Sequence, residues 1–275
     1  MDESIADLEA LYNVEATFEY TGRNGLAQAI RSFVNSRTFP GHVGLDDYTV
    51  LVTRFPPALF EEDFDEVDNP PVPSKSKNLY FPDSEILILT MKGPIHELVA
   101  RSVHDILTEK MRKMNCLDEL FPTGGKTVQL RGFNKEPDES WGPSINECPT
   151  CVLEVAVSES LRQLNRDAER WIKNELSHAT QVITVKIYPR RQEIIFAIWR
   201  RTARGEAEKV AEANVELQDG RPRVRPRIQF WLSFEELLKR YPRRGSAEKD
   251  IIFTARDLGG VARRVWHGMG LIPRG

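Results

Sequence analysis

The sequence lacks the features of a membrane-bound or exported protein. It contains no run of 18 apolar residues, so no membrane-spanning helix is predicted. The first residues, Met1 to Ser4, have neither the basic start nor the apolar stretch of a signal peptide. Only three cysteines occur in 275 residues, and this odd number does not predict a disulfide framework. We therefore expect a protein that stays inside the cell, in the cytosol or the nucleus, with no membrane partner.

The composition is that of an ordinary globular protein with unevenly distributed charge. Hydrophobic residues make up 40% and charged residues 29%, which is enough apolar material for a core. Residues 1–78 carry 6 Lys/Arg and 14 Asp/Glu, whereas residues 200–275 carry 17 and 10. The acidic part could repel nucleic acid or cover a basic surface, and the basic part could hold phosphates. Ordinary solvated loops are the alternative.

The spacing of apolar residues predicts alternating helices and strands. Helical spacing occurs over residues 3–12, 24–36, 95–111, 158–174, 233–241 and 257–269. Short apolar or alternating stretches predict strands over residues 48–55, 86–89, 127–133, 150–157, 181–188, 193–200 and 227–232. Their order predicts an α/β fold with a mixed central sheet flanked by helices.

We expect one main domain with an extension at each end. Residues 61–77 are acidic, rich in proline and poor in apolar pattern, which predicts a flexible linker. The predicted division is an acidic, partly helical extension at 1–78, a core at 79–200, and a basic extension packed on the core at 201–275.

Two carboxylates are the main candidates for chemistry. Asp138 follows Pro137, and Glu154 lies 16 residues later within an apolar strand. A carboxylate in such a strand must be partnered, metal-bound or protonated if it points inward. Carboxylates at neighbouring strand ends can share Mg²⁺ or Mn²⁺, and such an ion can polarise a phosphodiester and activate water. The alternative is that Glu154 faces a partly wet surface or pairs with an arginine.

The order of these motifs resembles a known superfamily. The residues that carry the resemblance are Pro94 at the start of a helix, Pro137 and Asp138, Glu154 in its strand, and Gln163, Asp167 and Trp171 in the next helix. They resemble an uncharacterised group of fungal proteins that look like PD-(D/E)XK restriction-endonuclease-like domains. Their bacterial relatives are candidate restriction endonucleases. The resemblance covers residues 85–200, less than half of the chain.

The resemblance implies a nuclease-like reaction centre. Asp138 and Glu154 would be metal ligands, Glu97 would be a third carboxylate, and Gln163 would orient substrate or water. Ala156 departs from the pattern, because the superfamily usually has a lysine there to position the nucleophile and stabilise the developing charge. A lysine from elsewhere could replace it, and the candidates are Lys135, Lys173 and Lys186. A solvated surface lysine is the alternative for each.

The basic C-terminal part contains candidate substrate contacts. Arg221, Arg223, Arg225 and Arg227 alternate along the chain, so a strand through them would place all four on one side. The prolines among them favour an edge strand or a loop. We expect Arg223, Arg225 and Arg227 to contact phosphates without sequence preference. The expected partner is nucleic acid, with DNA favoured over RNA.

Other features have simpler structural interpretations. Cys148 and Cys151 have C-x-x-C spacing, but no second pair completes a zinc site, and a strand follows them instead of the helix typical of a redox pair. Residues 124–127 imitate the end of a phosphate-binding loop and more simply form a turn. His96 is expected at the surface or as a helix cap, and Trp171 in the core.

We therefore predict a metal-dependent, nuclease-like protein that hydrolyses nucleic acid phosphodiesters with Mg²⁺ or Mn²⁺. The alternative is a catalytically inactive descendant of the nuclease fold that binds nucleic acid or a protein, which the missing motif lysine favours. A scaffold that binds a protein through its acidic linker is a third hypothesis. Carboxylates converging in a cleft beside a lysine would favour the enzyme, whereas a hydrophobic or arginine plug there would favour binding.

Overall fold

The computed structural model describes residues 4–37, 47–61, 72–73, 76–143, 148–225 and 229–273. The chain forms two compact units, each assembled from separate stretches of the sequence. The first unit contains residues 1–94, 127–136 and 158–160, and the second contains residues 95–126, 137–157 and 161–275. Most of the predicted linker at 61–77 lies outside the described residues, and so does Arg227.

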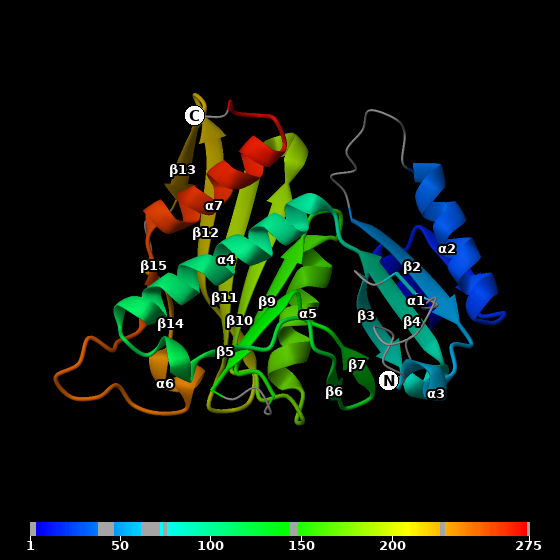
Figure 1. Cartoon of the computed structure of the whole chain (residues 1–275), viewed down its shortest axis with the longest axis horizontal. Helices are drawn as coiled ribbons and strands as arrows, with labels where there is room; N and C mark the ends of the chain where they lie inside the picture. The colour runs from blue at the N-terminus through cyan, green and yellow to red at the C-terminus, as the bar shows by residue number, and fades with distance from the viewer. Residues whose placement is uncertain are drawn as a thin grey trace. The chain divides into compact units, whose positions relative to one another are not determined.

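The first unit is a six-stranded sheet with helices packed on it (Figure 1). Its elements are α1 (Ile5–Tyr12), β1 (Ala16–Glu19), α2 (Arg23–Arg37), β2 (Tyr48–Thr53), α3 (Pro57–Phe60), β3 (Ser76–Phe81), η1 (Pro82–Ser84), β4 (Ile86–Met91), β6 (Val128–Leu130) and β7 (Phe133–Lys135). The strands lie in the order β1-β2-β4-β3-β7-β6. β1 and β2 are parallel, and the other neighbours are antiparallel.

Both faces of this first sheet are covered by apolar packing. Helix α2 packs on a cluster that contains Val50 and Val52 of β2. Helix α1 packs on a second cluster, which contains Leu51. Successive side chains of a strand point to opposite faces, so the unbroken apolar run in β2 serves both clusters.

The second unit is built on a seven-stranded mixed sheet. Its elements are α4 (Pro94–Lys113), η2 (Leu117–Glu119), β5 (Phe121–Pro122), β8 (Glu139–Gly142), β9 (Cys151–Ala156), α5 (Leu161–Lys173), β10 (Gln181–Tyr188), η3 (Pro189–Arg191), β11 (Glu193–Arg201), β12 (Ala207–Gln218), β13 (Arg221–Arg225), β14 (Phe230–Leu232), α6 (Phe234–Leu238), β15 (Ile251–Phe253) and α7 (Ala255–Gly268). The strand order is β13-β12-β11-β10-β9-β8-β5. β9 and β10 are parallel and the other neighbours are antiparallel, while β14 and β15 form a small separate sheet.

Helices cover the two faces of the seven-stranded sheet. α5 packs on β9, β10, β11 and β12, and α7 packs on β12 and β13. On α7, Gly259 lies against Pro222 and Val224 of β13. The register from β9 to β13 places Pro222 and Val224 on the face opposite to that of Glu154, which contacts α5. An ion pair of 2.7 Å joins α4 to α7. α4 and α7 therefore lie on one face and α5 on the other (Figure 1).

The predicted α/β fold with a mixed sheet flanked by helices is confirmed. The single strand predicted at 127–133 is instead the hairpin of β6 and β7, which turns at Gly132 with a φ of 88°. The compact units differ from the predicted division at 78 and 200, because β3 and β4 belong to the first sheet and β12 continues the second sheet beyond β11. Among the described residues, no helix is both long and apolar enough to span a bilayer.

Candidate functional site

Asp138 lies immediately before β8 and is enclosed by the chain. Its backbone N–H donates to the carbonyl of Leu153 at 3.1 Å, which fixes it beside β9. Its Oδ2 accepts a hydrogen bond of 2.6 Å from the Val155 N–H. Its Oδ1 lies 2.9 Å from Nε2 of His96, in the first turn of α4, and the Asp138 side chain is 0% exposed. Both carboxylate oxygens are therefore engaged by the chain itself.

Glu154 lies in β9 and is 1% exposed. Its Oε1 accepts a hydrogen bond from the indole Nε1 of Trp171, which is fully buried in α5. A buried carboxylate requires such a donor, because an unpaired charge away from water costs several kcal/mol. One partner of Glu154 is thus a tryptophan, a donor that the sequence analysis did not suggest for it.

The two carboxylates have partners from different helices. Asp138 contacts α4 on one face, and Glu154 contacts α5 on the other. Across the described part of the chain, no group of three His, Cys, Asp or Glu side chains is placed to hold a metal ion. Glu97, predicted as the third carboxylate, is exposed on α4. One residue advances a helix by about 100°, so burying His96 turns Glu97 away from the sheet.

Lys186 lies beside the position where the superfamily's lysine is missing. It is on β10, and the parallel register pairs it with Ala156 of β9. The side chain is buried, with 4% exposed, and its Nζ donates a hydrogen bond of 2.6 Å to the carbonyl of Val157. Nζ also lies 5.0 Å from the ring centroid of Tyr188. Glu154 and Ala156 share one face of β9, so Lys186 points to the same face as Glu154.

The other two candidate lysines have different surroundings. Lys135 belongs to the first unit, where it lies on β7 and is 1% exposed. Lys173 is exposed at the end of α5, and its Nζ forms an ion pair of 3.1 Å with Glu206. Lys173 therefore has the character of a surface lysine.

Gln163 lies on the buried side of α5 and is 1% exposed. The same helix contains an ion pair of 3.7 Å between Asp167 and Arg170. Burial lowers the pKa of Arg170 to about 10. The inner surface of α5 is therefore unusually polar for a helix that covers a sheet.

The alternating arginines lie on an edge strand. Arg221, Arg223 and Arg225 are exposed on β13, whereas Pro222 and Val224 between them are half-buried. β13 is the outermost strand of the seven-stranded sheet. The prediction of an edge strand with arginines on one side is confirmed for these three residues.

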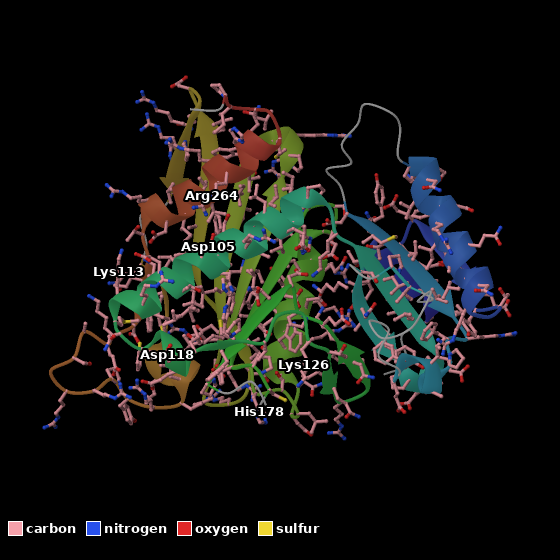
Figure 2. The ribbon with its side chains drawn as sticks, viewed as in Figure 1. Asp105, Lys113, Asp118, Lys126, His178 and Arg264 are labelled. Atoms are coloured by element: carbon pink, nitrogen blue, oxygen red, sulfur yellow. The ribbon has the colours of Figure 1, made fainter. Side chains whose placement is uncertain are left out.

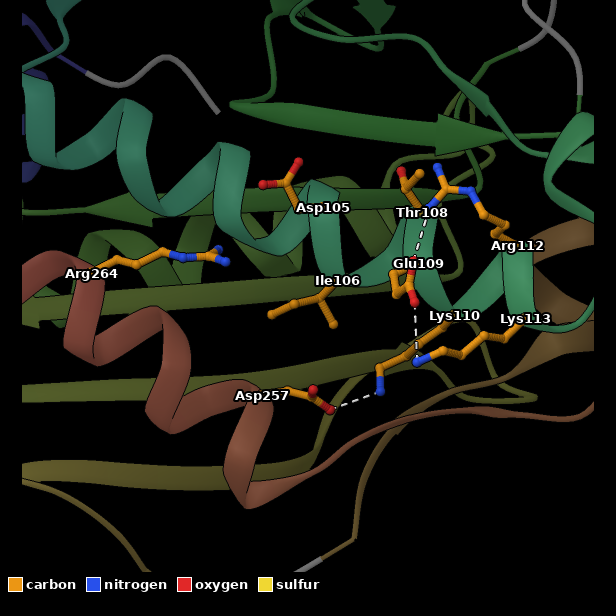
Figure 3. A pocket seen from close by; sticks show the side chains of 9 residues that line it. All are labelled: Asp105, Ile106, Thr108, Glu109, Lys110, Arg112, Lys113, Asp257 and Arg264. Atoms are coloured by element: carbon orange, nitrogen blue, oxygen red, sulfur yellow. Dashed lines mark hydrogen bonds and ion pairs between the residues drawn. The ribbon is translucent and has the colours of Figure 1, made fainter. Parts of the chain in front are cut away.

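A groove of about 440 Å³ lies between α4 and α7, on the face opposite to α5 (Figure 3). Its lining carries both signs of charge: Asp105, Ile106, Thr108, Glu109, Lys110, Arg112, Lys113, Asp257 and Arg264. Lys110 is paired with Asp257 at 2.7 Å, and Glu109 accepts from Arg112 and Lys113. Arg264 extends from α7 on this side of the second unit (Figure 2). Internal pairing leaves the groove without a dominant charge.

Two residues at the site were given other roles by the sequence. His96 was expected at the surface, but it is 1% exposed because it lies on the buried side of α4 and contacts Asp138. Its spacing to Val99, Ala100 and Val103, all buried, is the signal that could have placed it inward. Trp171 is in the core as predicted, and it also donates to Glu154.

The C-x-x-C pair and the turn at residues 124–127 are the two remaining motifs of the sequence analysis. Cys148 and Cys151 are free cysteines, and burial raises the pKa of the Cys151 thiol. Gly124 lies in a turn with a φ of 60°, as predicted for residues 124–127.

Comparison with known proteins identifies no family for this chain. No protein-family model matches the sequence, and no curated protein matches it. Among solved structures, the crystal structure of a candidate nuclease belonging to DUF820 from Anabaena variabilis is similar, with a TM-score of 0.43 and 10% sequence identity. The match covers 67% of this chain and 90% of that chain. A likeness at this level does not establish a common activity, so function is inferred from the site's own geometry.

Proposed function

We propose that this protein is a non-catalytic, nuclease-like module that binds the phosphodiester backbone of nucleic acid. The observation that carries this proposal is that both motif carboxylates bond to groups of the protein itself. Asp138 is held by His96 and the Val155 N–H, and Glu154 is held by Trp171. These contacts give the carboxylates a structural role.

The carboxylates are of the kind that binds a divalent ion, but they already bond to groups of the protein. Carboxylate oxygens suit Mg²⁺ and Mn²⁺, and Mg²⁺ is commonly bound by one or two carboxylates with water and phosphate completing its shell. Here, however, the two carboxylates bond to helices on opposite faces of the sheet. A bound ion would therefore have to compete with His96 at Asp138 and with Trp171 at Glu154. Trp171 over Glu154 is the kind of hydrophobic plug that favours binding over hydrolysis.

The binding part of the proposal is supported by charge. The basic residues concentrate in the last quarter of the chain, where Arg221, Arg223 and Arg225 are exposed on one side of an edge strand. Contacts of arginine to phosphate release counterions and do not depend on base sequence. DNA is the favoured partner, and RNA is a second arm of the test.

A second candidate is hydrolysis assisted by Mg²⁺ or Mn²⁺, and one observation favours it. Lys186 lies beside Ala156 and on the same face as Glu154, so a neighbouring strand could supply the ammonium group that the motif lacks. Buried ionisable groups gathered at one place are also more frequent at functional sites than elsewhere. In this candidate, Asp138 and Glu154 would exchange their contacts with His96 and Trp171 for the ion.

The test measures binding and cleavage on the same full-length protein. Fluorescein-labelled single-stranded DNA, duplex DNA and RNA are titrated in EDTA by anisotropy, and the same substrates are incubated with Mg²⁺ or Mn²⁺. The variants are Asp138→Asn, Glu154→Gln and Lys186→Met. Lys209→Met is the control, because Lys209 is an exposed lysine of the same sheet. Circular dichroism verifies that each variant is folded.

The proposed function predicts salt-dependent binding, no metal-dependent cutting, and unchanged affinity in Asp138→Asn and Glu154→Gln. Metal-dependent cutting that is lost in Asp138→Asn, Glu154→Gln and Lys186→Met, but kept in Lys209→Met, would replace this function with the second candidate. A folded protein that neither binds nor cuts nucleic acid would exclude both.

A further inference from the structure

We propose that the edge of the second sheet is a docking track for a nucleic acid backbone, formed by Arg221, Arg223 and Arg225 on β13. This arginine row rests on the proposed function and specifies which surface performs it. All three side chains are exposed on the same side of the strand. Within the described residues, none of the three has an ion-pair or hydrogen-bond partner for its side chain. Three guanidinium groups are thus available to an external anion.

Packing on the opposite side of β13 holds the arginine row in place. Pro222 and Val224 face α7, where a Cβ added at Gly259 would lie only 3.4 Å from Pro222 Cβ. The strand also pairs over its whole length with β12. Because the two residues between the arginines are fixed against a helix, the arginines must project to the other face. The row is therefore a rigid feature of the sheet, and little backbone ordering is needed on binding.

The acidic neighbours of the row are occupied by amide groups. Glu216 pairs in register with Arg223, and its Oε2 accepts a hydrogen bond of 3.0 Å from Gln218. One strand further, Glu193 accepts a hydrogen bond of 2.7 Å from Asn214. These carboxylates lower the positive potential beside the row, but within the described part of the chain they form no ion pair with its three arginines. A phosphate thus replaces water at the arginines and displaces no protein partner.

The spacing of the arginine row suits a polyphosphate backbone. Two residues of an antiparallel strand advance about 6.8 Å. One nucleotide step of a DNA strand advances about 3.4 Å along the helix axis, so two steps also advance about 6.8 Å and alternate arginines match every second phosphate. The arginines at alternate positions of β13 can therefore each contact a phosphate of the same backbone, whereas a single anion would contact only part of the row. This repeat favours an extended polyanion over a mononucleotide or an isolated phosphate.

The arginine row and the cluster at Glu154 lie on the same face of one sheet. The register runs from Arg225 through Asn214 and Ile195 to Lys186, which pairs with Ala156. Three strand spacings separate Arg225 from Lys186, which is about 14 Å. That distance corresponds to roughly four nucleotide steps of a DNA strand. Helix α5 packs on this face over β9 to β12 and Lys186 is buried, so an external backbone can reach the arginine row at the sheet edge but not Lys186.

The test compares two triple variants that remove equal charge from opposite faces. One is Arg221→Gln/Arg223→Gln/Arg225→Gln. The matched control is Arg256→Gln/Arg263→Gln/Arg264→Gln, since these three arginines are exposed on α7. Binding of labelled single-stranded DNA, duplex DNA and RNA is measured in EDTA at several salt concentrations, so that no cleavage can occur. The readout is the slope of log K against log salt.

We expect the β13 triple variant to reduce the slope for duplex DNA by about 2.7, which is three phosphate contacts at about 0.9 each. For single strands the expected reduction is about 2.1. The α7 triple variant should leave the slope close to that of the wild type. Both variants should keep the wild-type melting temperature, because the exchanged side chains are exposed.

Three outcomes would overturn the proposal that the arginine row binds nucleic acid. They are a wild-type slope in the β13 triple variant, an equal reduction in the α7 triple variant, and equally tight binding of polyglutamate, which would indicate an acidic protein partner. The outcome is separable from that of the proposed function. If the β13 variant binds nucleic acid as the wild type does, the arginine row is not the binding surface, but the protein is still a nucleic-acid-binding module. If that variant loses binding and the wild type cuts nucleic acid when a metal is present, the arginine row is confirmed as the binding surface, but the proposal of a non-catalytic function is wrong.

Discussion

Replacing Trp171 with phenylalanine tests whether Glu154 depends on its indole donor. Phenylalanine keeps an aromatic ring in the fully buried site but removes the N–H that donates to Glu154 Oε1. The carboxylate, which is 1% exposed, then loses a hydrogen bond without gaining water. We expect the folded state to be destabilised far more than the change of ring size requires.

The magnitude follows from two contributions. A hydrogen bond to a charged group contributes about 1.5–3 kcal/mol. The smaller ring leaves unfilled space in a closed core, which costs roughly 1–2 kcal/mol. Trp171→Phe should therefore lower the free energy of unfolding by about 2.5–5 kcal/mol, a large share of the stability of a typical domain.

Trp141→Phe is the matched control. Trp141 is also buried, with 1% exposed, but its Nε1 has no hydrogen-bond partner among the described residues. This variant should show only the loss of ring volume, about 1–2 kcal/mol. Urea unfolding followed by far-UV circular dichroism avoids the fluorescence change that removing a tryptophan causes. The transition to follow is that of the second unit, because a chain of two units need not unfold in one step.

A double-mutant cycle isolates the bond. In a Glu154→Leu background, Trp171→Phe should cost no more than the control, so the coupling energy between the two positions should be about 1.5–3 kcal/mol. Equal destabilisation by Trp171→Phe and Trp141→Phe, or a coupling energy near zero, would refute a structural role for the Trp171–Glu154 contact.

Three further predictions concern other parts of the chain. A hydrogen bond from Arg240 lowers the pKa of Glu248 to about 2, below the unfolded value of about 4.3. The free energy of unfolding, measured with urea, should therefore fall as the pH drops from about 5 towards 2. The same dependence on pH in Glu248→Gln would contradict this. Thr254 and Asp257 form a capping box at the start of α7, so Thr254→Ala should cost about 0.5–2 kcal/mol in urea unfolding, and an unchanged midpoint would be the contrary result. Gly132 has a φ of 88°, so Gly132→Ala should destabilise the first unit by roughly 1–2 kcal/mol, measured by thermal unfolding, whereas a higher melting temperature would be inconsistent with that turn.

The parts of the fold that the sequence predicts well are those with strong apolar periodicity. β10 and β11 are rich in β-branched residues and were predicted within one residue of their bounds. β12 was not predicted, although it is a long strand. Its buried side is formed mainly by Ala211, Ala213 and Val215, and Glu212 and Asn214 lie between them. Alanine and glutamate favour helices, so the sequence of β12 gives only a weak signal for a strand. Its strand conformation depends on pairing with β11 and β13.

The candidate site was only partly predictable. Glu154 was recognisable from its apolar surroundings and Asp138 from the Pro-Asp pattern that it forms with Pro137, and the need of a buried carboxylate for a partner follows from elementary electrostatics. The identity of the partners depends on which helix face packs beside each strand, and this is a tertiary property. Likewise, three lysines were equivalent in the sequence, and only the register between β9 and β10 distinguishes Lys186 by placing it next to Ala156.

The hairpin of β6 and β7 has a consequence for how the first unit is made. All the other strands of its sheet lie before residue 94, yet β3 is flanked by β4 on one side and by β7 on the other. During synthesis, β3 therefore presents an unpaired edge until residues 128–135 have left the ribosome. A recombinant fragment that stops at residue 94 should associate through this edge, whereas one that includes the hairpin would not present it. The choice of expression boundaries, and the interval in which a chaperone would protect the nascent chain, both depend on this late-arriving hairpin.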